Sequence, residues 1–577
     1  MAVLEQYSWI IGIISVALCA SSFGNGANDV ANAYANSVAA RTMTMPQVGI
    51  LAMFTEFFGA VVLGSRVTGT IKNDVIDLGR FRASPSVLIL AMGCVEMASA
   101  GFLLVATKLG FPVSTTQSVV GALVGAGIAA NSQISWGWKK GSVSQIAASW
   151  VVAPLIAAAI SAALFGTLKF AVLERKNSFE KAMRAIPFYL AFTASMLALF
   201  MTVEAPGAPS LEDLGAGTAV GIVVGVFVGV LALSYIFFVP YAHRRLVMED
   251  SRIRARHMIL GPLLRRENPP IFWPAKGDAV VVDHYATAEP VADNTASGDP
   301  EKAKASTADS SNNSSSSENR ADDLERGQQQ QQQQQQAETA RVQRYKRKPE
   351  PEERFLGPTA HLPMYNPRRL WSYVKYWLLQ GVTRDCVTHA ATELEAVHGR
   401  ARRYDNRIEH LWTYAQIPSA VMMSIAHGSN DVANAIGPWV AAYQTYRTGV
   451  VSEDTDTPVW ILVVAGFLLG FGFWCMGHHI VSAMGNRLTQ LSPTRGFSME
   501  LGAAITVLMA SRLALPISTT QTLMGAVCGV GLMNMDAGAV NWRQIAKIAL
   551  GWILTLPCAG LLSGLLFAMA LNTPHFA

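Results

Sequence analysis

Residues 28–33 read Asn-Asp-Val-Ala-Asn-Ala, and residues 430–435 repeat this phrase letter for letter. A second polar phrase, Pro-Val-Ser-Thr-Thr-Gln at 112–117, returns as Pro-Ile-Ser-Thr-Thr-Gln at 516–521. The first pair is offset by 402 residues and the second by 404, so both phrases belong to one duplicated unit. Amides, hydroxyls and carboxylates within apolar sequence are costly unless they face a partner, a cavity or an ion. Matching polar phrases in two repeats therefore predict a transport site between them.

The composition indicates a polytopic membrane protein. Of the 577 residues, 51% are hydrophobic and only 15% are charged. More than half of the charged residues fall within residues 241–410, so the rest of the chain is very poor in charge. The net charge of +5 therefore gives no reason to expect a nucleic-acid partner.

Signals for catalysis are weak throughout the chain. It has no Walker loop, no dinucleotide-binding glycine fingerprint in a strand-to-helix setting, no His-Glu-x-x-His motif and no nucleophile elbow. The six cysteines show no spacing typical of a disulfide framework or a metal cluster. We therefore expect neither an enzyme nor a resident cofactor.

The apolar runs predict an all-α fold with about twelve membrane spans, since a helix needs about 20 apolar residues to cross a bilayer. The predicted spans are 7–40, 46–71, 84–108, 111–131, 145–171, 186–203, 215–240, 413–444, 459–484, 497–511, 516–533 and 544–572. The first and the eighth are too long for one straight crossing, so we expect a break at each Asn-Asp motif. The two short stretches with Ser-Thr-Thr-Gln are either full spans or re-entrant hairpins.

The chain divides into an N-terminal membrane repeat with connecting spans (1–240), a hydrophilic insert (241–410) and a C-terminal membrane repeat (411–577). Seven spans precede the insert, and this odd number makes the second repeat an inverted copy of the first, as in many transporters. Basic residues in 172–185 and 243–256 mark the cytoplasmic side. We therefore expect a cytosolic insert and both termini outside the cell.

Most of the insert has the composition of a disordered segment. It contains nine consecutive glutamines at 328–336. A mixture of basic and aromatic residues near 366–382 is different, and it predicts either an interfacial helix on the membrane surface or an amphipathic helix packed on the membrane domain.

The Asn-Asp motifs have the residue types of a cation site. Asn28 and Asn32 are four residues apart, on one face of a helix, with Asp29 beside them. The second motif repeats this arrangement. Hard cations take carboxylate, amide and carbonyl oxygens as ligands, and Na⁺ follows the same preference. The alternative is that the asparagines only join helices by hydrogen bonds.

The Ser-Thr-Thr-Gln phrases have the residue types of a helix start. Ser114 with Gln117, and Ser518 with Gln521, fit a capping box, with a proline just before each. A helix N-terminus offers free N–H groups and a partial positive charge, which attract anions. Two such ends from inverted repeats would suit a tetrahedral oxyanion, although each Ser-Thr pair could also be an ordinary cap.

Three acids lie within predicted spans. Glu96 and Glu500 correspond at the 404-residue offset, whereas Glu56 has no acidic counterpart near Val463. An unmatched acid is a candidate for handling ions or protons. The alternative for Glu56 is a salt bridge, for example with Arg66.

These motifs resemble those of the inorganic phosphate transporter (PiT) family, the type III sodium–phosphate symporters, and the low-complexity insert is similar to that of fungal members. The resemblance implies a helical transporter, commonly dimeric. It implies that phosphate is held by the two Ser-Thr-Thr-Gln phrases together with Asn28 and Asn430, that Na⁺ is held by two Asp-Asn pairs, and that three glutamates serve coupling. The phosphate residues in the two phrases are Ser114, Thr115, Thr116, Gln117, Ser518, Thr519, Thr520 and Gln521. The Na⁺ residues are Asp29, Asn32, Asp431 and Asn434, and the coupling glutamates are Glu56, Glu96 and Glu500.

The function expected on these grounds is a plasma-membrane symporter that imports inorganic phosphate with Na⁺ by alternating access. A proton-coupled phosphate or sulfate transporter is the first alternative. A phosphate-sensing, transporter-like receptor that signals through its insert is the second.

Overall fold

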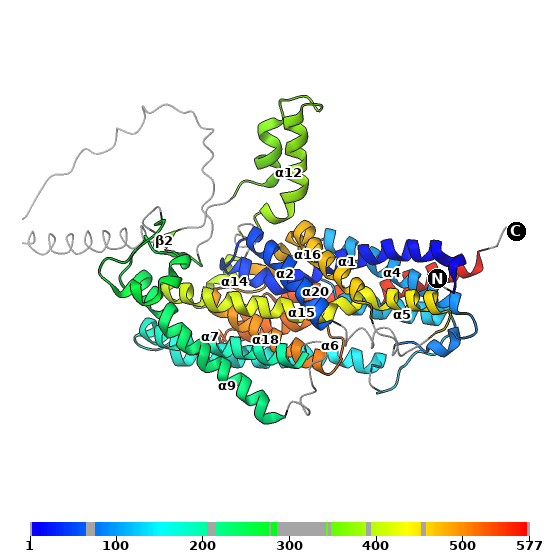
Figure 1. The fold of residues 1–577 in the computed structure, drawn as a ribbon, viewed down its shortest axis with the longest axis horizontal. Helices are drawn as coiled ribbons and strands as arrows, with labels where there is room; N and C mark the ends of the chain where they lie inside the picture. Colours follow the sequence, from blue (N-terminus) through cyan, green and yellow to red (C-terminus); the bar gives the residue numbers. More distant parts are fainter. Residues whose placement is uncertain are drawn as a thin grey trace, which may run out of the picture.

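The computed structural model of the chain describes residues 3–64, 75–139, 141–204, 215–275, 279–285, 342–343, 348–387, 394–451 and 457–573. Most of these residues belong to helices (Figure 1). The low-complexity part of the insert lies outside the described residues, and so does Arg66.

Two sets of five elements make up the repeats. The first comprises α1 (Ser8–Ala39), α2 (Met45–Leu63), α4 (Pro85–Lys108), α5 (Thr115–Ala129) and α6 (Val143–Leu168). The second comprises α15 (Asn406–Thr448), α16 (Val459–Met476) with α17 (His478–Leu488), α18 (Pro493–Arg512), α19 (Thr519–Leu532) and α20 (Trp542–Asn572). Between them run α7 (Ser178–Glu204), α9 (Ala216–Leu233), η4 (Ser234–Phe238), α10 (Val239–Ala242), η5 (His243–Val247), η6 (Ala255–Arg265), η7 (Glu352–Leu356), η8 (Gly357–Thr359), α12 (Pro367–Thr383) and α14 (Glu395–Gly399).

The remaining short elements are η1 (Glu5–Tyr7), η2 (Leu78–Phe81), η3 (Lys169–Leu173) and η9 (Ala537–Ala539). Two short strands, β1 (Val281–Val282) and β2 (Val342–Gln343), pair in parallel at either side of the low-complexity segment. Among the described residues, eight helices are long and apolar enough to span a membrane. Each of the twelve predicted spans overlaps at least one helix, and the prediction of an all-α polytopic membrane protein is confirmed.

Corresponding helices of the two repeats run in opposite directions. Ser8 near the start of α1 bonds Tyr446 near the end of α15, and Asn25 further along α1 bonds the backbone of Asp431. Past the end of α1, Thr42 bonds Gln416 close to the start of α15. Helix α1 packs on α16 just as α15 packs on α2, and α5 packs on α20 just as α19 packs on α6. The two halves are therefore inverted copies related by a pseudo-twofold axis.

The expected break in the first and eighth spans is wrong. Helices α1 and α15 run without interruption through their Asn-Asp motifs, over 32 and 43 residues. The glycines of these motifs instead permit close helix packing: a Cβ at Gly26 would overlap the Leu469 carbonyl oxygen of α16, and one at Gly428 would lie 2.7 Å from the Glu56 carbonyl oxygen of α2. A non-helical residue occurs elsewhere, at Gly485 within α17, and the predicted span 459–484 is divided at Gly477 into α16 and the beginning of α17.

Helices α5 and α19 are short. They contain 15 and 14 residues, fewer than the roughly 20 needed for a full crossing, and each follows a tight turn after a longer helix. This geometry is that of a re-entrant hairpin. A glycine lets each short helix pack closely on its neighbour. A Cβ at Gly125 of α5 would overlap the Gly560 carbonyl oxygen of α20, and a Cβ at Gly529 of α19 would overlap the Ala158 carbonyl oxygen of α6.

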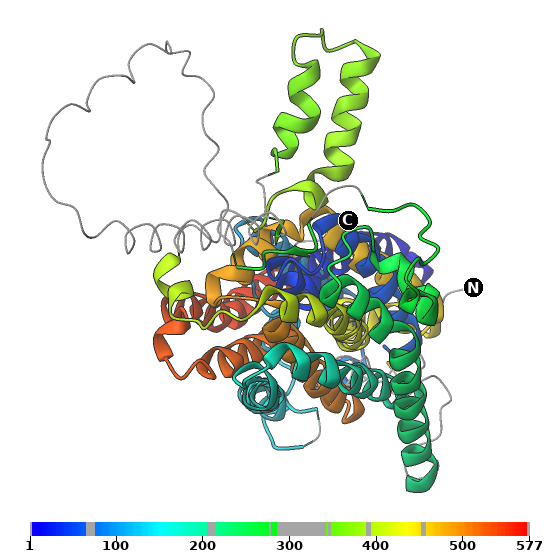
Figure 2. The ribbon, with the colours of Figure 1, turned by 90° about the vertical axis from the view of Figure 1, so that its left-hand side faces the viewer.

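Strand β2, η6 and the start of α15 lie at one end of the long helices, and the start of α1 and the end of α20 lie at the other (Figure 1). At the insert end, residues 279–285 pack on the start of α15: His284 Nδ1 is 2.9 Å from the Ala40 carbonyl oxygen, and Tyr285 bonds Glu409. Helix α12 projects sideways from the body, across the direction of α1 and α15 (Figures 1 and 2).

Candidate functional site

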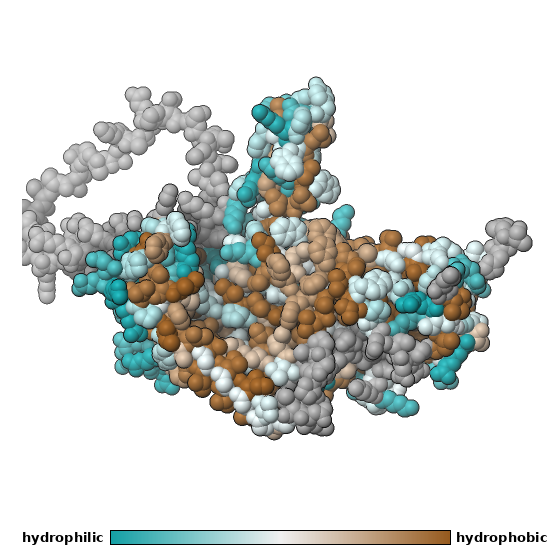
Figure 3. Space-filling view, in the orientation of Figure 1, coloured by the Kyte–Doolittle hydropathy of each residue, from teal (hydrophilic) through white to brown (hydrophobic). Residues whose placement is uncertain are grey.

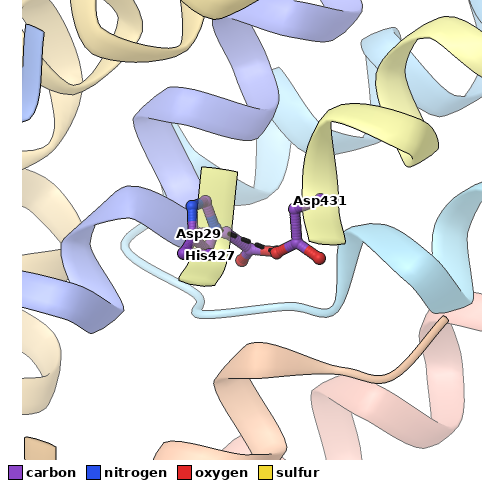
Figure 4. Close-up of side chains that lie close together, drawn as sticks. All are labelled: Asp29, His427 and Asp431. Atoms are coloured by element: carbon purple, nitrogen blue, oxygen red, sulfur yellow. Dashed lines mark ion pairs between the residues drawn. The ribbon is translucent and has the colours of Figure 1, made fainter. Parts of the chain in front are cut away.

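The two Asn-Asp motifs meet in the interior of the helical bundle. Asp29 from α1 lies beside His427 and Asp431 from α15, with one ligand atom of each within 4.8 Å of the others (Figure 4). All three side chains are buried. The structure thus joins the two aspartates, which are 402 positions apart in sequence, in one cluster at the interface between the repeats.

Each aspartate accepts hydrogen bonds from the start of a hairpin helix. Thr115 Oγ1 of α5 donates to Asp29 Oδ2 over 2.7 Å, and Thr519 Oγ1 of α19 donates to Asp431 Oδ2 over 2.8 Å. Thr520 Oγ1 also lies 3.0 Å from Asp29 Oδ1. The N-termini of both hairpin helices therefore point toward the carboxylates, and their partial positive charge favours anions there.

The serines of the two Ser-Thr-Thr-Gln phrases cap their helices as predicted, but the return bond from each glutamine that completes a capping box is not formed among the described residues. Ser114 Oγ accepts from the Gln117 N–H at 3.2 Å, and Ser518 Oγ accepts from the Gln521 N–H at 3.3 Å. Two further contacts cross between the hairpins. Thr116 Oγ1 donates to the Ile517 carbonyl oxygen at 2.9 Å, and Thr520 Oγ1 lies 3.2 Å from that of Val113. The two helix starts are thus in direct contact across the pseudo-twofold axis.

The second asparagine of each motif crosses to the opposite repeat. Asn32 Nδ2 donates to Thr520 Oγ1 at 2.8 Å, and Asn434 Nδ2 donates to Thr116 Oγ1 at 2.9 Å. In the described part of the chain, the buried side-chain oxygens without a hydrogen-bond donor include those of four site amides: Asn32, Asn434, Gln117 and Gln521. Buried acceptors without donors are costly, and a bound cation would satisfy them.

The first asparagine of each motif holds a hairpin turn. Asn28 Nδ2 donates to Thr107 Oγ1 and to the Phe111 carbonyl oxygen, at 3.0 and 3.1 Å. Asn430 Nδ2 makes the same pair of bonds to Ser511 Oγ and the Leu515 carbonyl oxygen, at 3.2 and 3.3 Å. Reasoning from sequence missed Thr107 and Ser511. A signal for them exists, because both are hydroxyl residues at the 404-residue offset.

The arrangement of motifs, repeats and hairpins can be compared with known proteins. A family model described as the phosphate transporter family matches residues 25–563. The chain belongs to the phosphate transporter family. A phosphate-repressible phosphate permease of Neurospora crassa is 37% identical to it, over 100% of this chain and 99% of that protein. Sodium-dependent phosphate transporter 2 of Bos taurus is 27% identical, over 99% of each chain.

A solved structure described as the sodium-dependent phosphate transporter has the same fold, with a TM-score of 0.63 and 23% identity over 98% of this chain and 100% of that one. The predicted family is therefore confirmed. Members of the phosphate transporter family are transporters, so the expectation that the protein is not an enzyme is confirmed as well.

One acid of this phosphate transporter family member joins the central cluster through a histidine. Glu56 Oε2 of α2 lies 2.7 Å from His427 Nδ1, and Asp431 Oδ2 lies 2.9 Å from His427 Nε2. Ser424 Oγ donates to the other Glu56 oxygen at 2.5 Å. The His427 side chain thus links Glu56 to Asp431. The predicted alternative partner of Glu56, Arg66, lies outside the described residues.

The other two acids lie in separate surroundings, although they correspond in the repeats. Glu500 of α18 accepts from Ser37 Oγ at 2.7 Å and from Ser419 Oγ at 3.0 Å, so it links the end of α1 to α15. Glu96 of α4 is fully buried, beside Ser21 and the backbone of Trp439. Glu96 and Glu500 correspond in the repeated sequence, but different side chains surround them in the structure.

Negative charge dominates the centre of the site. Asp29, Asp431 and Glu56 are all buried, and His427 is the basic side chain that contacts two of them. Buried carboxylates are strongly destabilising unless cations or donors compensate them. The donor set of carboxylate and amide oxygens is the one that Na⁺ prefers, and the adjoining helix starts suit an oxyanion.

Proposed function

We propose that this protein is a secondary active symporter that imports inorganic phosphate together with Na⁺ across the plasma membrane by alternating access. The observation that carries the proposal is the meeting of Asp29 and Asp431, each hydrogen-bonded to the start of a hairpin helix from inverted repeats. Relatives described as sodium-dependent phosphate transporters support the choice of Na⁺ as the coupled ion.

The proposed Na⁺ ligands are the carboxylates and amide oxygens of the Asp-Asn pairs. These are Asp29, Asn32, Asp431 and Asn434. The oxygens of Asn32 and Asn434 are buried without a donor, while their nitrogens are used in bonds to the opposite hairpin. Each amide is therefore held so that its oxygen remains open to a cation.

The proposed phosphate donors belong to the helix starts. They are Ser114, Thr115, Thr116 and Gln117 with Ser518, Thr519, Thr520 and Gln521. Hydroxyl, amide and backbone N–H groups at two facing N-termini provide donors without a fixed cation. We assign Asn28 and Asn430 to the phosphate site through the hairpin turns that they fix.

The geometry gives a reason for coupling. The hydroxyls of Thr115 and Thr519 donate to Asp29 and Asp431, so the carboxylates compete with phosphate for these donors. Na⁺ at the carboxylates offsets their charge, and the threonine hydroxyls can then turn to the anion. Phosphate thus binds well after Na⁺, and the loaded, compensated site is the one that changes access. We propose that Glu56, Glu96 and Glu500 adjust this charge balance.

The same proposal includes an orientation. The start of α1 and the end of α20 lie at the opposite end of the long helices from β2 and the start of α15, which supports a cytosolic insert and external termini (Figure 1). A homodimer is an expectation from the family resemblance and stays a prediction.

The proposal is tested by phosphate uptake into proteoliposomes with Na⁺ and pH gradients imposed separately. We expect an inward Na⁺ gradient to drive accumulation and a pH gradient alone to fail. Accumulation driven by the pH gradient alone would instead establish a proton-coupled carrier, and sulfate competition would then define the anion. Deletion of residues 295–345 tests the receptor alternative, because a transporter keeps its uptake without this segment.

A further inference from the structure

The hairpin that carries α12 stands apart from the membrane domain. The hairpin, residues 348–387, consists of η7, η8, a turn and α12, and it extends sideways from the body in both ribbon views (Figures 1 and 2). Its two arms pack on each other: Tyr376 Oη donates to Glu352 Oε1 at 3.0 Å, and Arg384 Nη2 lies 2.7 Å from the same atom. Only one face of α12 is therefore turned toward its own hairpin.

The outer face of α12 is apolar and uncovered. Its residues follow one another at positions i, i+1, i+4, i+7 and i+8, so they form a single stripe. Trp377 and Trp371 are 68% and 58% exposed, and the remaining members are Leu370, Val374 and Leu378. A stripe with two tryptophans is a large apolar area to leave in water.

Positive charge borders this stripe. Arg368 and Lys375 are exposed along one edge of it, and α12 contains no acidic residue. Lys375 Nζ lies 5.7 Å from the centre of the Trp371 ring. Basic residues beside tryptophan and leucine are typical of helices that lie in the headgroup layer of a membrane.

The attachment of α12 places it beside the lipid-facing surface of the bundle. Trp474 Nε1, near the end of α16, donates to the Leu378 carbonyl oxygen at 2.7 Å, and Gly381 fits closely against the backbone of Trp474. Helix α16 spans the membrane by length and composition, and its Phe467 is exposed. Because α16 ends where α12 begins to project, α12 lies at a membrane boundary and runs along it.

Figure 3 shows the same division on the surface. Hydrophobic residues gather along the right-hand side of the hairpin, toward the end of the bundle where α1 starts. Hydrophilic residues gather on its left-hand side, toward the end where α15 starts. We infer that α12 is a membrane-surface helix, with its apolar stripe inserted into the leaflet at the insert end and Arg368 and Lys375 on anionic lipid headgroups. This inference does not depend on what the protein transports.

Photo-crosslinking in lipid nanodiscs tests the inference with the full chain. p-Benzoylphenylalanine is placed at Trp377, on the stripe, or at Tyr376, on the inner face, in nanodiscs of phosphatidylcholine with phosphatidylserine. We expect irradiation to give a lipid adduct at position 377 and a crosslink within the hairpin at position 376, both read by mass spectrometry.

Charge reversal provides the second measurement. In the background with the probe at 377, Arg368→Glu with Lys375→Glu should lower the phosphatidylserine share of the adducts by roughly tenfold while phosphatidylcholine adducts persist. A probe at 377 that reacts with a second copy of the chain, or with no lipid, would overturn the inference. An unchanged phosphatidylserine share in the charge-reversed variant would overturn the headgroup assignment.

Discussion

His427 Nδ1 lies 2.7 Å from Glu56 Oε2, and this pair breaks the symmetry of an otherwise duplicated site. The residue that corresponds to His427 in the first repeat is Asn25, whose amide nitrogen bonds the Asp431 backbone at 2.9 Å. The two aspartates therefore have different surroundings: Asp431 contacts an imidazole, whereas Asp29 accepts from Thr115 and Thr520. The two proposed ion sites are therefore unequal, although the motif is duplicated.

The Glu56–His427 pair should act as a unit. We expect Glu56→Gln and His427→Asn each to reduce Na⁺-driven phosphate uptake strongly, and the double variant to lose little more than either single one, because residues in direct contact are not additive. Uptake rates at several Na⁺ concentrations measure this. Fully additive losses would show that the two residues work independently. Phe179→Leu, at an aromatic contact of Arg407, serves as a remote control.

The aspartates should be essential for transport and dispensable for folding. Asp29→Asn and Asp431→Asn each replace one carboxylate oxygen by an amide group, so the charge that holds Na⁺ is lost. We expect Na⁺-driven phosphate uptake to be abolished in proteoliposomes with normal protein content. Asp405→Asn is a matched control, because Asp405 caps α15 and asparagine is an equally good cap. Wild-type uptake in either site variant would refute the assigned role.

The hydroxyls behind the hairpin turns should matter for phosphate affinity. Thr107→Val removes one of the two acceptors of the Asn28 amide and leaves one of its amide hydrogens unsatisfied, at a cost of about 1–3 kcal/mol. We expect the hairpin to shift and the apparent KM for phosphate to rise, and Ser511→Ala should act in the same way on the other hairpin. Thr202→Val is the control, since Thr202 bonds only its own helix at Ala198 among the bonds of the described residues. Equal effects of Thr107→Val and Thr202→Val would argue against a positioning role.

The contact of residues 279–285 with the membrane domain should weaken in acid. Burial lowers the pKa of His284 from its ordinary value of 6.5, so the folded state favours the neutral ring. Stability from this contact is complete above about pH 6.5 and declines as the pH falls below it, because the released segment binds the proton more readily. Hydrogen-exchange protection factors of residues 279–285 between pH 8 and pH 5 measure the effect. His284→Gln should lose the pH dependence, and a wild-type profile in that variant would assign the effect to another group.

Much of this site can be predicted from sequence because it is local and duplicated. Ser114 and Ser518 are identified by the capping pattern that they share with Gln117 and Gln521. The meeting of Asp29 and Asp431 follows from inverted repeats, which bring corresponding positions to one axis. Contacts that break the symmetry could not be predicted, because nothing near His427 in the chain points to Glu56, which lies 371 residues away.

The wrong prediction of broken helices has a physical origin. Glycines and polar residues in a long apolar stretch are typical both of an interrupted helix and of a helix packed closely on its neighbours. In α1 and α15 the second explanation holds, because Gly26 and Gly428 face the backbones of α16 and α2. The choice depends on packing between segments far apart in sequence, and single-sequence patterns do not contain that information.

The close helix contacts at Gly125 and Gly529 limit how these helices can move. Sliding α5 along α20, or α19 along α6, would press carbonyl oxygens of the neighbouring helix against the backbone at Gly125 and Gly529. We therefore expect each of these two helix pairs to move as a rigid unit. Threonine hydrogen bonds cross the seam between these two helix pairs, and they exchange partners at a far lower free-energy cost than the repacking of a backbone contact. Under the alternating access proposed above, we expect the substrate path to open along this seam while the close contacts at Gly125 and Gly529 stay intact.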